Sequence, residues 1–303
     1  MKAMILAAGL GTRLRPLTTN KPKALIPVIN RPIIGRTIDY LKTHGVTRIV
    51  VNAHHHFQQI LDYLNGGRPF GMDIEVLVEP EILGTGGGIK NASDFWGDEP
   101  FIVINSDILT DIDLGNVYEY HKKSGCIATL ALHDYEPFNQ IRIDNNQKII
   151  DIAPNKAPGR LAFTCIHIMD PDLLSYIPGS GYSDIIDCYR RLIRSNKTII
   201  NAYLAKGHYW RDIGNVDSYI RANKEILDLD KESFSVGAES KMDSSVKFEG
   251  WVVVGENTYI EKDVEISRSI LWDNVRVNKG IKITDSIVTS SSEVDNDLIE
   301  EIY

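Results

Sequence analysis

The sequence predicts an α/β protein in which a Rossmann-like, mixed and mostly parallel sheet is followed by a short left-handed parallel β-helix of hexapeptide repeats. Two observations carry this prediction. Segments typical of strands and helices alternate from the N-terminus to about residue 105, as in a parallel sheet with helices on both faces. After residue 230, aliphatic residues recur at every sixth position, as in a β-helix. At 303 residues the chain is long enough for two domains, which we expect at residues 1–230 and 234–303.

The first third of the chain contains the alternating segments. Apolar runs are expected to form buried strands, and runs with helical periodicity are expected to form the helices between them. The expected strands are residues 3–8, 48–52, 73–78 and 101–104, and the expected helices are residues 33–44, 57–64 and 89–93. A glycine cluster at residues 84–88 is expected to be a loop that leads into the last of these helices.

The middle of the chain has a different pattern. Short strand-like runs with turn residues between them predict a partly antiparallel region. The expected strands are residues 128–133, 140–143, 148–152, 162–169 and 199–204, and the expected helices are residues 114–124, 183–195 and 216–229.

The C-terminal part contains a six-residue repeat. Val254, Ile260 and Ile266 are six positions apart, and Val275 and Ile281 continue the spacing after a shift of register. Three such hexads make one coil of a parallel β-helix, so the tract predicts a few coils. Residues 234–303 contain no histidine, which argues against an acyltransferase site. We expect an assembly or regulatory element, with a homo-oligomer formed through the β-helix.

Composition argues against several classes of protein. The 33 basic and 41 acidic residues give a net charge of −8, which is unlike a nucleic-acid-binding surface. No apolar run reaches the ~18 residues that a membrane helix needs, and the first residues lead into a strand rather than a signal peptide. We therefore expect a cytoplasmic protein with no membrane partner. The three cysteines have neither metal-ligand nor disulfide spacing.

The N-terminal strand runs directly into a glycine turn, Gly9-Leu10-Gly11-Thr12-Arg13. Such a turn exposes backbone amides at the carboxyl end of a strand, where open α/β sheets bind ligands, and successive amides can form a nest for an anion. Arg13 adds a forked cation and Lys23 adds a point charge. Together these features predict a site for a polyphosphate.

Two common glycine motifs do not fit this turn. The dinucleotide fingerprint requires a third glycine, where this chain has Leu14, and an uninterrupted helix, where it has Pro16. The Walker loop requires Gly-Lys-Ser/Thr, where this chain has Gly11-Thr12-Arg13. The predicted phosphate site therefore belongs to another class.

A longer ordered pattern surrounds the turn. It reads Leu6-Ala7-Ala8-Gly9-x-Gly11-Thr12-Arg13-Leu14-x-Pro16-Leu17-Thr18, with Lys23 ten residues after Arg13. This pattern resembles the signature of the sugar-1-phosphate nucleotidyltransferases, also called nucleotide-sugar pyrophosphorylases. Later motifs are most similar to those of the N-acetylmuramate-1-phosphate uridylyltransferases and the mannose-1-phosphate guanylyltransferase-like members of that family. These motifs are Gly84-Thr85-Gly86-Gly87-Gly88, Asn105-x-Asp107 and Trp210-x-Asp212-x-Gly214.

The resemblance implies a fold of the nucleotide-diphospho-sugar transferase type and a particular reaction. A phosphate oxygen of a sugar 1-phosphate attacks the α-phosphorus of a nucleoside triphosphate in line, and an NDP-sugar and pyrophosphate are formed. Because the nucleophile is already anionic, no general base is needed, and a metal with a few cations suffices. UTP and GTP are both open as substrates, as is the sugar. A non-catalytic, nucleotide-sugar-binding regulatory subunit is the alternative function.

The resemblance also implies roles for individual residues. Arg13, Lys23 and Asp107 would be catalytic. Asp107 and Asp212 would hold Mg²⁺, which favours one or two carboxylates together with phosphate oxygens and water. The residues expected to bind the nucleotide are Leu6, Ala8, Gly9, Gly11, Thr12, Arg13, Lys23, Glu79, Gly84, Thr85 and Gly86. The residues expected to bind the sugar are Asn155, Phe163 and Thr164.

Two positions depart from the family's pattern. Asn155-Lys156-Ala157 stands where many relatives have Glu-Lys-Pro, and Cys165 stands where a glycine often follows two residues after the phenylalanine. Both departures lie on the sugar side of the implied site. The sequence therefore determines the reaction more closely than the sugar.

Overall fold

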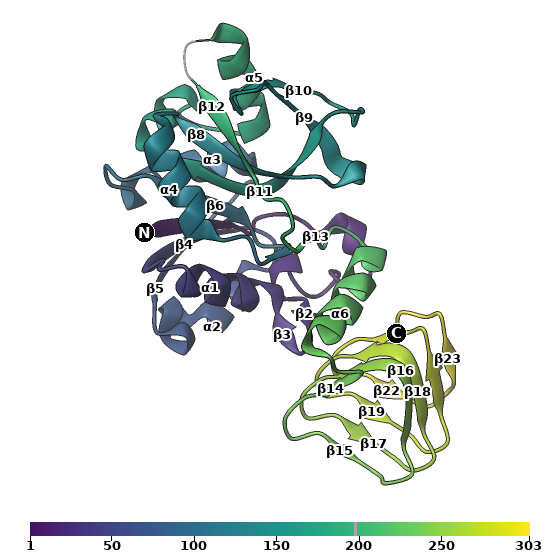
Figure 1. Cartoon of the computed structure of the whole chain (residues 1–303). Helices are drawn as coiled ribbons and strands as arrows, with labels where there is room; N and C mark the ends of the chain where they lie inside the picture. Colours follow the sequence, from purple (N-terminus) through teal and green to yellow (C-terminus); the bar gives the residue numbers. More distant parts are fainter. Residues whose placement is uncertain (197–198) are drawn as a thin grey trace. The chain divides into compact units, whose positions relative to one another are not determined.

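The computed structural model describes residues 1–196 and 199–303 (Figure 1). The chain divides into two compact units. The first unit contains Met1–Leu10, Pro22–Ala24 and Ile34–Asp212, and the second contains Gly11–Lys21, Leu25–Ile33 and Ile213–Tyr303. Among the described residues, no helix combines the length and the apolar character that a membrane crossing needs.

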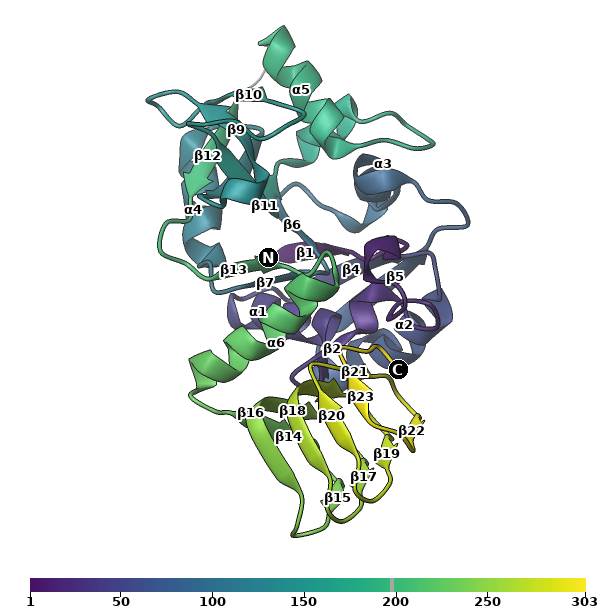
Figure 2. The same ribbon diagram turned by 90° about the vertical axis from the view of Figure 1, so that its right-hand side faces the viewer.

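The first unit is built on a nine-stranded mixed sheet whose central strands are parallel. Strand β1 (Lys2–Leu6) lies between β4 (Arg48–Ala53) and β6 (Phe101–Asn105), and β4 also pairs with β5 (Asp73–Val78). Helices α1 (Ile33–Thr43) and α2 (Phe57–Leu64) lie on one face of these strands, and α3 (Gly84–Asn91) lies on the other (Figures 1 and 2). Because both faces are covered, β1, β4 and β6 are buried over most of their length, as the apolar runs predicted.

The other half of this sheet is largely antiparallel, which confirms the prediction for the middle of the chain. Strand β11 (Leu161–Met169) runs antiparallel to β6 and joins the two halves. It also pairs with β8 (Ala128–His133) and β9 (Asn139–Ile143), both antiparallel. Strand β12 (Ile200–Leu204) runs parallel to β8, and β10 (Ile149–Ile152) runs antiparallel to β9.

Helices α4 (Leu114–Ser124) and α5 (Ile185–Ser195) begin and end at residues with clear local causes. The Asp113 carboxylate accepts from Asn116 N at the start of α4, and Asp184 accepts from Ile186 N at the start of α5. Gly125 and Asn196 then take left-handed conformations that end the two helices. The apolar face of α5 is buried against the antiparallel half of the sheet through Ile185, Cys188, Tyr189 and Leu192.

One expected boundary is wrong. The glycine cluster was expected to be a loop before a helix at residues 89–93, but α3 spans Gly84–Asn91 and so includes the whole cluster. Glycine is a poor helix former, so its composition argues against this helix. The helix forms because its first turn is held from outside: the amides of Gly86 and Gly87 both donate to Ser183 O, at 2.8 and 3.1 Å.

The second unit contains a β-hairpin, a helix and a C-terminal series of short parallel strands. Strands β2 (Pro27–Val28) and β3 (Arg31–Pro32) form the hairpin. Helix α6 (Val216–Asp230) begins at a capping box made by Asn215 and Ser218. Residues 234–303 form what we call the C-terminal stack, in which two sheets contain only parallel pairs (Figure 2).

Strands of the C-terminal stack pair at a nearly regular spacing along the chain. Lys247 pairs with Glu265, three hexads further along, and Tyr259 pairs with Arg276, one residue short of three hexads. The aliphatic residues of the repeat, such as Val254, are buried in one apolar core. One sheet contains β14 (Phe234–Val236), β16 (Lys247–Val254), β18 (Glu265–Leu271), β20 (Lys282–Thr284), β21 (Ile287–Val288) and β23 (Leu298–Ile299). The other contains β15 (Lys241–Met242), β17 (Tyr259–Ile260), β19 (Arg276–Val277) and β22 (Glu293–Val294).

Candidate active site

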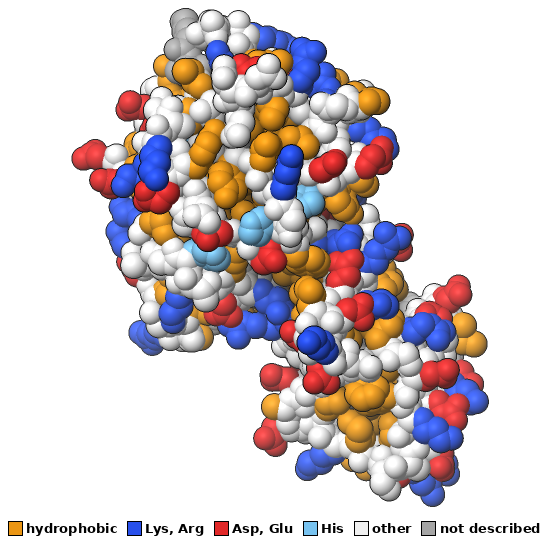
Figure 3. Space-filling model, viewed as in Figure 1, with side chains coloured by type: hydrophobic (Ala, Val, Ile, Leu, Met, Phe, Trp, Pro, Cys, Tyr) orange, Lys and Arg blue, Asp and Glu red, His pale blue; other side chains and the backbone are white. Residues whose placement is uncertain are grey.

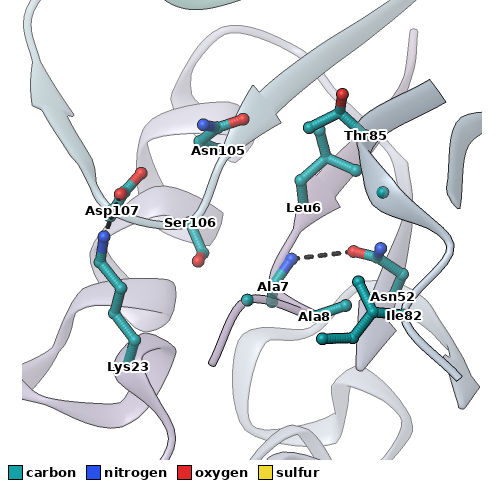
Figure 4. Close-up of a pocket in the computed structure, with 12 residues that line it drawn as sticks. Leu6, Ala7, Ala8, Lys23, Asn52, Ile82, Thr85, Asn105, Ser106 and Asp107 are labelled. Atoms are coloured by element: carbon teal, nitrogen blue, oxygen red, sulfur yellow. Dashed lines mark hydrogen bonds and ion pairs between the residues drawn. The ribbon is translucent and has the colours of Figure 1, made fainter. Parts of the chain in front are cut away.

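A pocket opens at the carboxyl ends of the parallel strands of the first unit. Because β1, β4 and β6 are neighbours that run in the same direction, the residues that follow them meet at one edge of the sheet. The start of α3 forms another wall, and Figure 4 shows these side chains and backbone segments around the hollow. The lining residues are Leu6, Ala7, Ala8, Gly9, Lys23, Asn52, Ile82, Gly84, Thr85, Asn105, Ser106 and Asp107.

The charged part of this pocket is an ion pair between Lys23 and Asp107. Lys23 Nζ contacts Asp107 Oδ2, and the two side chains are only 14% and 12% exposed (Figure 4). Asp107 Oδ1 is buried and has no hydrogen-bond partner among the described residues. Leaving a buried polar atom unpaired costs about 1–3 kcal/mol, so this oxygen is suited to a ligand that brings positive charge.

Asp212, the second expected metal ligand, is placed by a short antiparallel pair. Strand β13 (Trp210–Asp212) pairs with β7 (Ile108–Thr110), and Asp212 lies opposite Ile108, the residue after Asp107. The described residues contain no cluster of three or more His, Cys, Asp or Glu side chains that could hold a metal ion. Two carboxylates, one at the end of β13 and one just before the strand paired with it, suit a hard divalent cation that takes its other ligands from phosphate and water.

Cys165 lies close to both of these carboxylates. It occupies a left-handed backbone conformation, with φ of 60°, at an irregularity in the pairing of β11. Burial raises the pKa of its thiol far above the usual range, the charges of Asp107 and Asp212 raise it further, and Lys23 opposes the shift. The charges that act on this thiol are therefore those of the expected metal ligands and of Lys23.

The start of α3 is hydrogen-bonded to the segment that precedes α5. Besides the two bonds to Ser183 O, Ser183 N donates to Leu83 O at 2.8 Å, and Ile185 N donates to Thr85 Oγ1 at 3.0 Å. Gly84 has φ of 72°, and a Cβ there would lie 2.6 Å from Ser183 O. This position therefore accepts only glycine without a shift of the backbone.

A buried pair of polar side chains connects the glycine turn after β1 to the start of α3. Asn52 Oδ1 accepts from Ala7 N at 2.8 Å (Figure 4). Asn52 Nδ2 donates to Glu79 Oε1 at 2.7 Å. Glu79 Oε2 then accepts from Leu83 N at 3.1 Å. Asn52 and Glu79 are only 3% and 1% exposed. The pair therefore fixes the turn after β1 relative to the start of α3.

The pocket brings together many of the residues expected to bind a nucleotide, but not all of them. Those that line it are Leu6, Ala8, Gly9, Lys23, Gly84 and Thr85. Glu79 and Gly86 are buried and are not among the lining residues. Gly11, Thr12 and Arg13 belong to the second unit, where Gly11 O accepts from Leu14 N and from Thr18 Oγ1.

The residues expected to bind a sugar do not line this pocket. Asn155 is exposed. Phe163 is half-buried, and its ring meets that of His167 edge-on. Thr164 is fully buried, its Oγ1 donates to Ala131 O, and its carbonyl accepts from Trp210 Nε1. The side chain of Thr164 is therefore satisfied inside the sheet.

Sequence reasoning missed five lining residues: Ala7, Asn52, Ile82, Asn105 and Ser106. For two of these residues, the sequence contains a feature from which a role in the site could have been predicted. Asn52 is a polar residue at the end of an apolar strand in a parallel sheet, which is where such sheets place ligand contacts. Asn105 precedes Asp107 in a motif from which only the aspartate was selected.

A parallel sheet that gathers glycine turns, a lysine and an aspartate at its carboxyl edge defines a class of nucleotide-binding α/β enzymes. The model of the nucleotidyl transferase family matches residues 2–229, so the chain belongs to this family, which confirms the resemblance predicted from the sequence. Members of the family generally use a divalent metal.

Individual relatives agree with this assignment. The chain is 29% identical to the UTP–glucose-1-phosphate uridylyltransferase of Synechocystis sp., over 97% of this chain and 84% of that protein. It is 34% identical to the N-acetylmuramate alpha-1-phosphate uridylyltransferase of Neisseria meningitidis, over 71% of this chain and 94% of that protein. A solved structure from Bacillus anthracis, provisionally described as a glucose-1-phosphate thymidylyltransferase in complex with sucrose, superposes with a TM-score of 0.67 at 27% identity, over 75% of this chain and 96% of that one.

Proposed function

We propose that the protein catalyses the formation of an NDP-sugar and pyrophosphate from a nucleoside triphosphate, UTP or GTP, and a sugar 1-phosphate. The observation that carries this proposal is the Lys23–Asp107 pair with its unpaired carboxylate oxygen, at the carboxyl edge of a parallel sheet in a nucleotidyl transferase. Two of the relatives are named as uridylyltransferases that act on sugar 1-phosphates, and another is named as a mannose-1-phosphate guanyltransferase.

The reaction needs alignment and charge neutralisation more than acid–base chemistry. The attacking phosphate oxygen of the sugar is already anionic, so no residue has to remove a proton. Lys23 and Arg13 would neutralise the phosphates. Asp107 and Asp212 would hold Mg²⁺, and because Lys23 engages Asp107 Oδ2, the free ligand atom is Oδ1. Bound there, the metal would supply further positive charge to the phosphates.

The nucleotide would lie between the glycine turn after β1 and the glycine-rich start of α3. Leu6, Ala8 and Gly9 would contact it on one side, and Gly84 and Thr85 on the other. Gly11, Thr12 and Arg13 would extend the first loop around the phosphates. Glu79 and Gly86 are buried, so they would not contact the nucleotide themselves. They would instead fix the backbone at the start of α3, through their bonds to Leu83 N and Ser183 O.

The sugar would bind beside the antiparallel half of the sheet. Asn155 and Phe163 are accessible enough to contact it directly, whereas Thr164 would contribute through the conformation of β11. Cys165 would add a side chain where relatives often have none. This residue is therefore the first one to examine when the preferred sugar is known.

We also propose that residues 1–230 form the nucleotidyltransferase domain and that residues 234–303, the C-terminal stack, form a left-handed parallel β-helix in a cytoplasmic protein. The coil length of about three hexads supports the β-helix. Strand β14 lies at the end of one sheet, and its side chains Phe234 and Val236 are 46% and 45% exposed. Figure 3 shows hydrophobic side chains gathered on the face of the C-terminal stack that is turned toward the viewer. An exposed apolar edge strand supports a homo-oligomer formed through the stack.

Pyrophosphate release is the direct test of the proposed reaction. The protein with Mg²⁺ is crossed with UTP, GTP, dTTP, CTP and ATP against the 1-phosphates of N-acetylmuramate, mannose, glucose and heptose. We expect turnover with UTP or GTP and one sugar. Nucleotide binding without turnover across the whole panel would instead support the regulatory subunit.

A further inference from the structure

Residues 11–21, which include the second half of the glycine signature and which we call the glycine-signature segment, belong to the same compact unit as the C-terminal stack. The β2–β3 hairpin is held at its turn, where Asn30 Nδ2 donates to Val254 O of β16 at 2.7 Å. The preceding residue, Ile29, donates its backbone N–H to Asn223 Oδ1 of α6 at 2.9 Å, and Asn223 is fully buried. The hairpin that follows Lys23 is thus bonded to both α6 and the stack.

A second connection runs through Trp272, the residue after β18. Trp272 Nε1 donates to the hydroxyl of Tyr219 on α6 at 2.9 Å, and that hydroxyl donates to Pro27 O at 2.8 Å. Trp272 and Tyr219 are 3% and 0% exposed. Burial raises the pKa of Tyr219 well above its usual range, so its hydroxyl keeps the proton that it donates.

The same indole also contacts the glycine-signature segment directly. Lys21 Nζ lies 5.7 Å from the centroid of the Trp272 ring, within the range of a cation–π contact. Lys21 is the last residue of the Gly11–Lys21 segment, which carries Arg13. Trp272 therefore contacts Lys21 with its ring and, through Tyr219, holds Pro27 with its N–H group.

These two contacts flank Lys23 along the chain. Lys21 lies two residues before it, and Pro27 lies four residues after it. The backbone on each side of the proposed catalytic lysine is therefore tied to a residue of the C-terminal stack. A small displacement of a catalytic group is enough to reduce a rate by about 100-fold, so these ties can matter for turnover.

We propose that the C-terminal stack is a positioning element for nucleotidyl transfer and that Trp272 is its principal positioning residue. Through Lys21 and through Tyr219 it sets the conformation of residues 11–21 and 25–33, which include Arg13 and flank Lys23 along the chain. The inference rests on the proposed function for the role of these cations, whereas the coupling of Trp272 to the segment rests on the contacts alone.

The test compares Trp272→Leu with Trp251→Leu in the full chain. Trp251 lies on β16 of the same stack and takes no part in the contacts just described, so it is a matched control for loss of an indole. The first measurement is amide hydrogen exchange of residues 11–21. We expect exchange about tenfold faster in Trp272→Leu and unchanged in Trp251→Leu, because only the first variant releases Lys21 and Pro27.

The second measurement separates positioning from stability. In Trp272→Leu we expect the KM for the nucleoside triphosphate to rise about tenfold, with little change in the KM for the sugar 1-phosphate. Trp272→Phe keeps an aromatic ring under Lys21 and loses only the N–H, so it should recover part of the affinity. The double variant Lys21→Gln/Trp272→Leu should have the same KM for the nucleoside triphosphate as Trp272→Leu alone, because both substitutions remove the same Lys21–Trp272 contact.

If Trp272→Leu keeps the thermal melting transition of the unsubstituted protein and the exchange of residues 11–21 is also unchanged, the proposal is overturned. If Trp272→Leu unfolds the stack, Trp272→Phe and Lys21→Gln replace it, and unchanged exchange in both would overturn the proposal equally. Failure of the proposed function appears elsewhere, as absence of pyrophosphate release from the unsubstituted protein, and leaves the exchange measurement decisive for the coupling.

Discussion

Replacing Asp107 with asparagine should remove activity while leaving the fold in place. Asparagine has the shape of aspartate and can still accept a hydrogen bond from Lys23, so the packing of the pocket is preserved. The lost charge affects a pair whose side chains are 14% and 12% exposed. Removing one charge of a buried pair costs about 3–5 kcal/mol, and the residual access to water reduces this to about 1–2 kcal/mol here.

This estimate converts to measurable quantities. For a domain of this size, about 1–2 kcal/mol lowers the Tm by about 2–8 °C, which a thermal melt resolves. The effect on kcat should be far larger, a fall of about 100- to 1,000-fold, because the variant loses the carboxylate proposed to hold the metal. Asp98→Asn, at an exposed position, is the matched control and should change neither quantity. A kcat within about tenfold of the unsubstituted enzyme, in a folded Asp107→Asn protein, would refute the assignment.

Three further substitutions test the neighbouring geometry. Gly84→Ala places a Cβ about 2.6 Å from Ser183 O at positive φ, so we expect a loss of stability of at least about 1 kcal/mol and reduced nucleotide affinity; a melt and a binding titration that match the unsubstituted protein would contradict this. Glu79→Gln turns an NH₂ donor toward either Asn52 Nδ2 or Leu83 N, so the KM for the nucleotide should rise about tenfold, with an unchanged KM counting against a positioning role. Cys165→Gly relieves a left-handed conformation worth about 1 kcal/mol or more, and its Tm should rise by a few degrees; a fall in Tm would show that the thiol contributes packing that outweighs the strain.

Periodicity predicted most of the elements because their causes are local. Helices α2 and α4 and strand β5 have the expected bounds, since their apolar spacing and their end residues lie within the segments themselves. Helix α3 did not follow from its sequence, because the carbonyl that holds its first turn belongs to Ser183, about a hundred residues away. Local patterns in a single sequence cannot predict a contact between residues so far apart along the chain.

The same distinction applies to the site. Lys23 and Asp107 were predicted from motifs and are adjacent in the pocket. Asn52 was missed because its importance comes from a bond to Ala7, the residue after the neighbouring strand β1, and only the sheet order reveals that these strands are neighbours. The side chain of Thr164 bonds to the neighbouring strand inside the sheet rather than facing a ligand. In a regular strand, alternation predicts which side chains share a face, but the irregularity in β11 beside Thr164 breaks that alternation.

The Lys23–Asp107 pair has a consequence for the order in which ligands bind. A divalent cation that approaches alone meets a carboxylate already shared with an ammonium group, and the two positive charges repel each other. A nucleoside triphosphate carries several negative charges, which can engage Lys23 and relieve that repulsion. Calorimetric titration should therefore show weak cation binding without nucleotide and much tighter binding with it; equal affinities would exclude this coupling. In kinetic terms, the cation–nucleotide complex, rather than either component, would be the first substrate to bind.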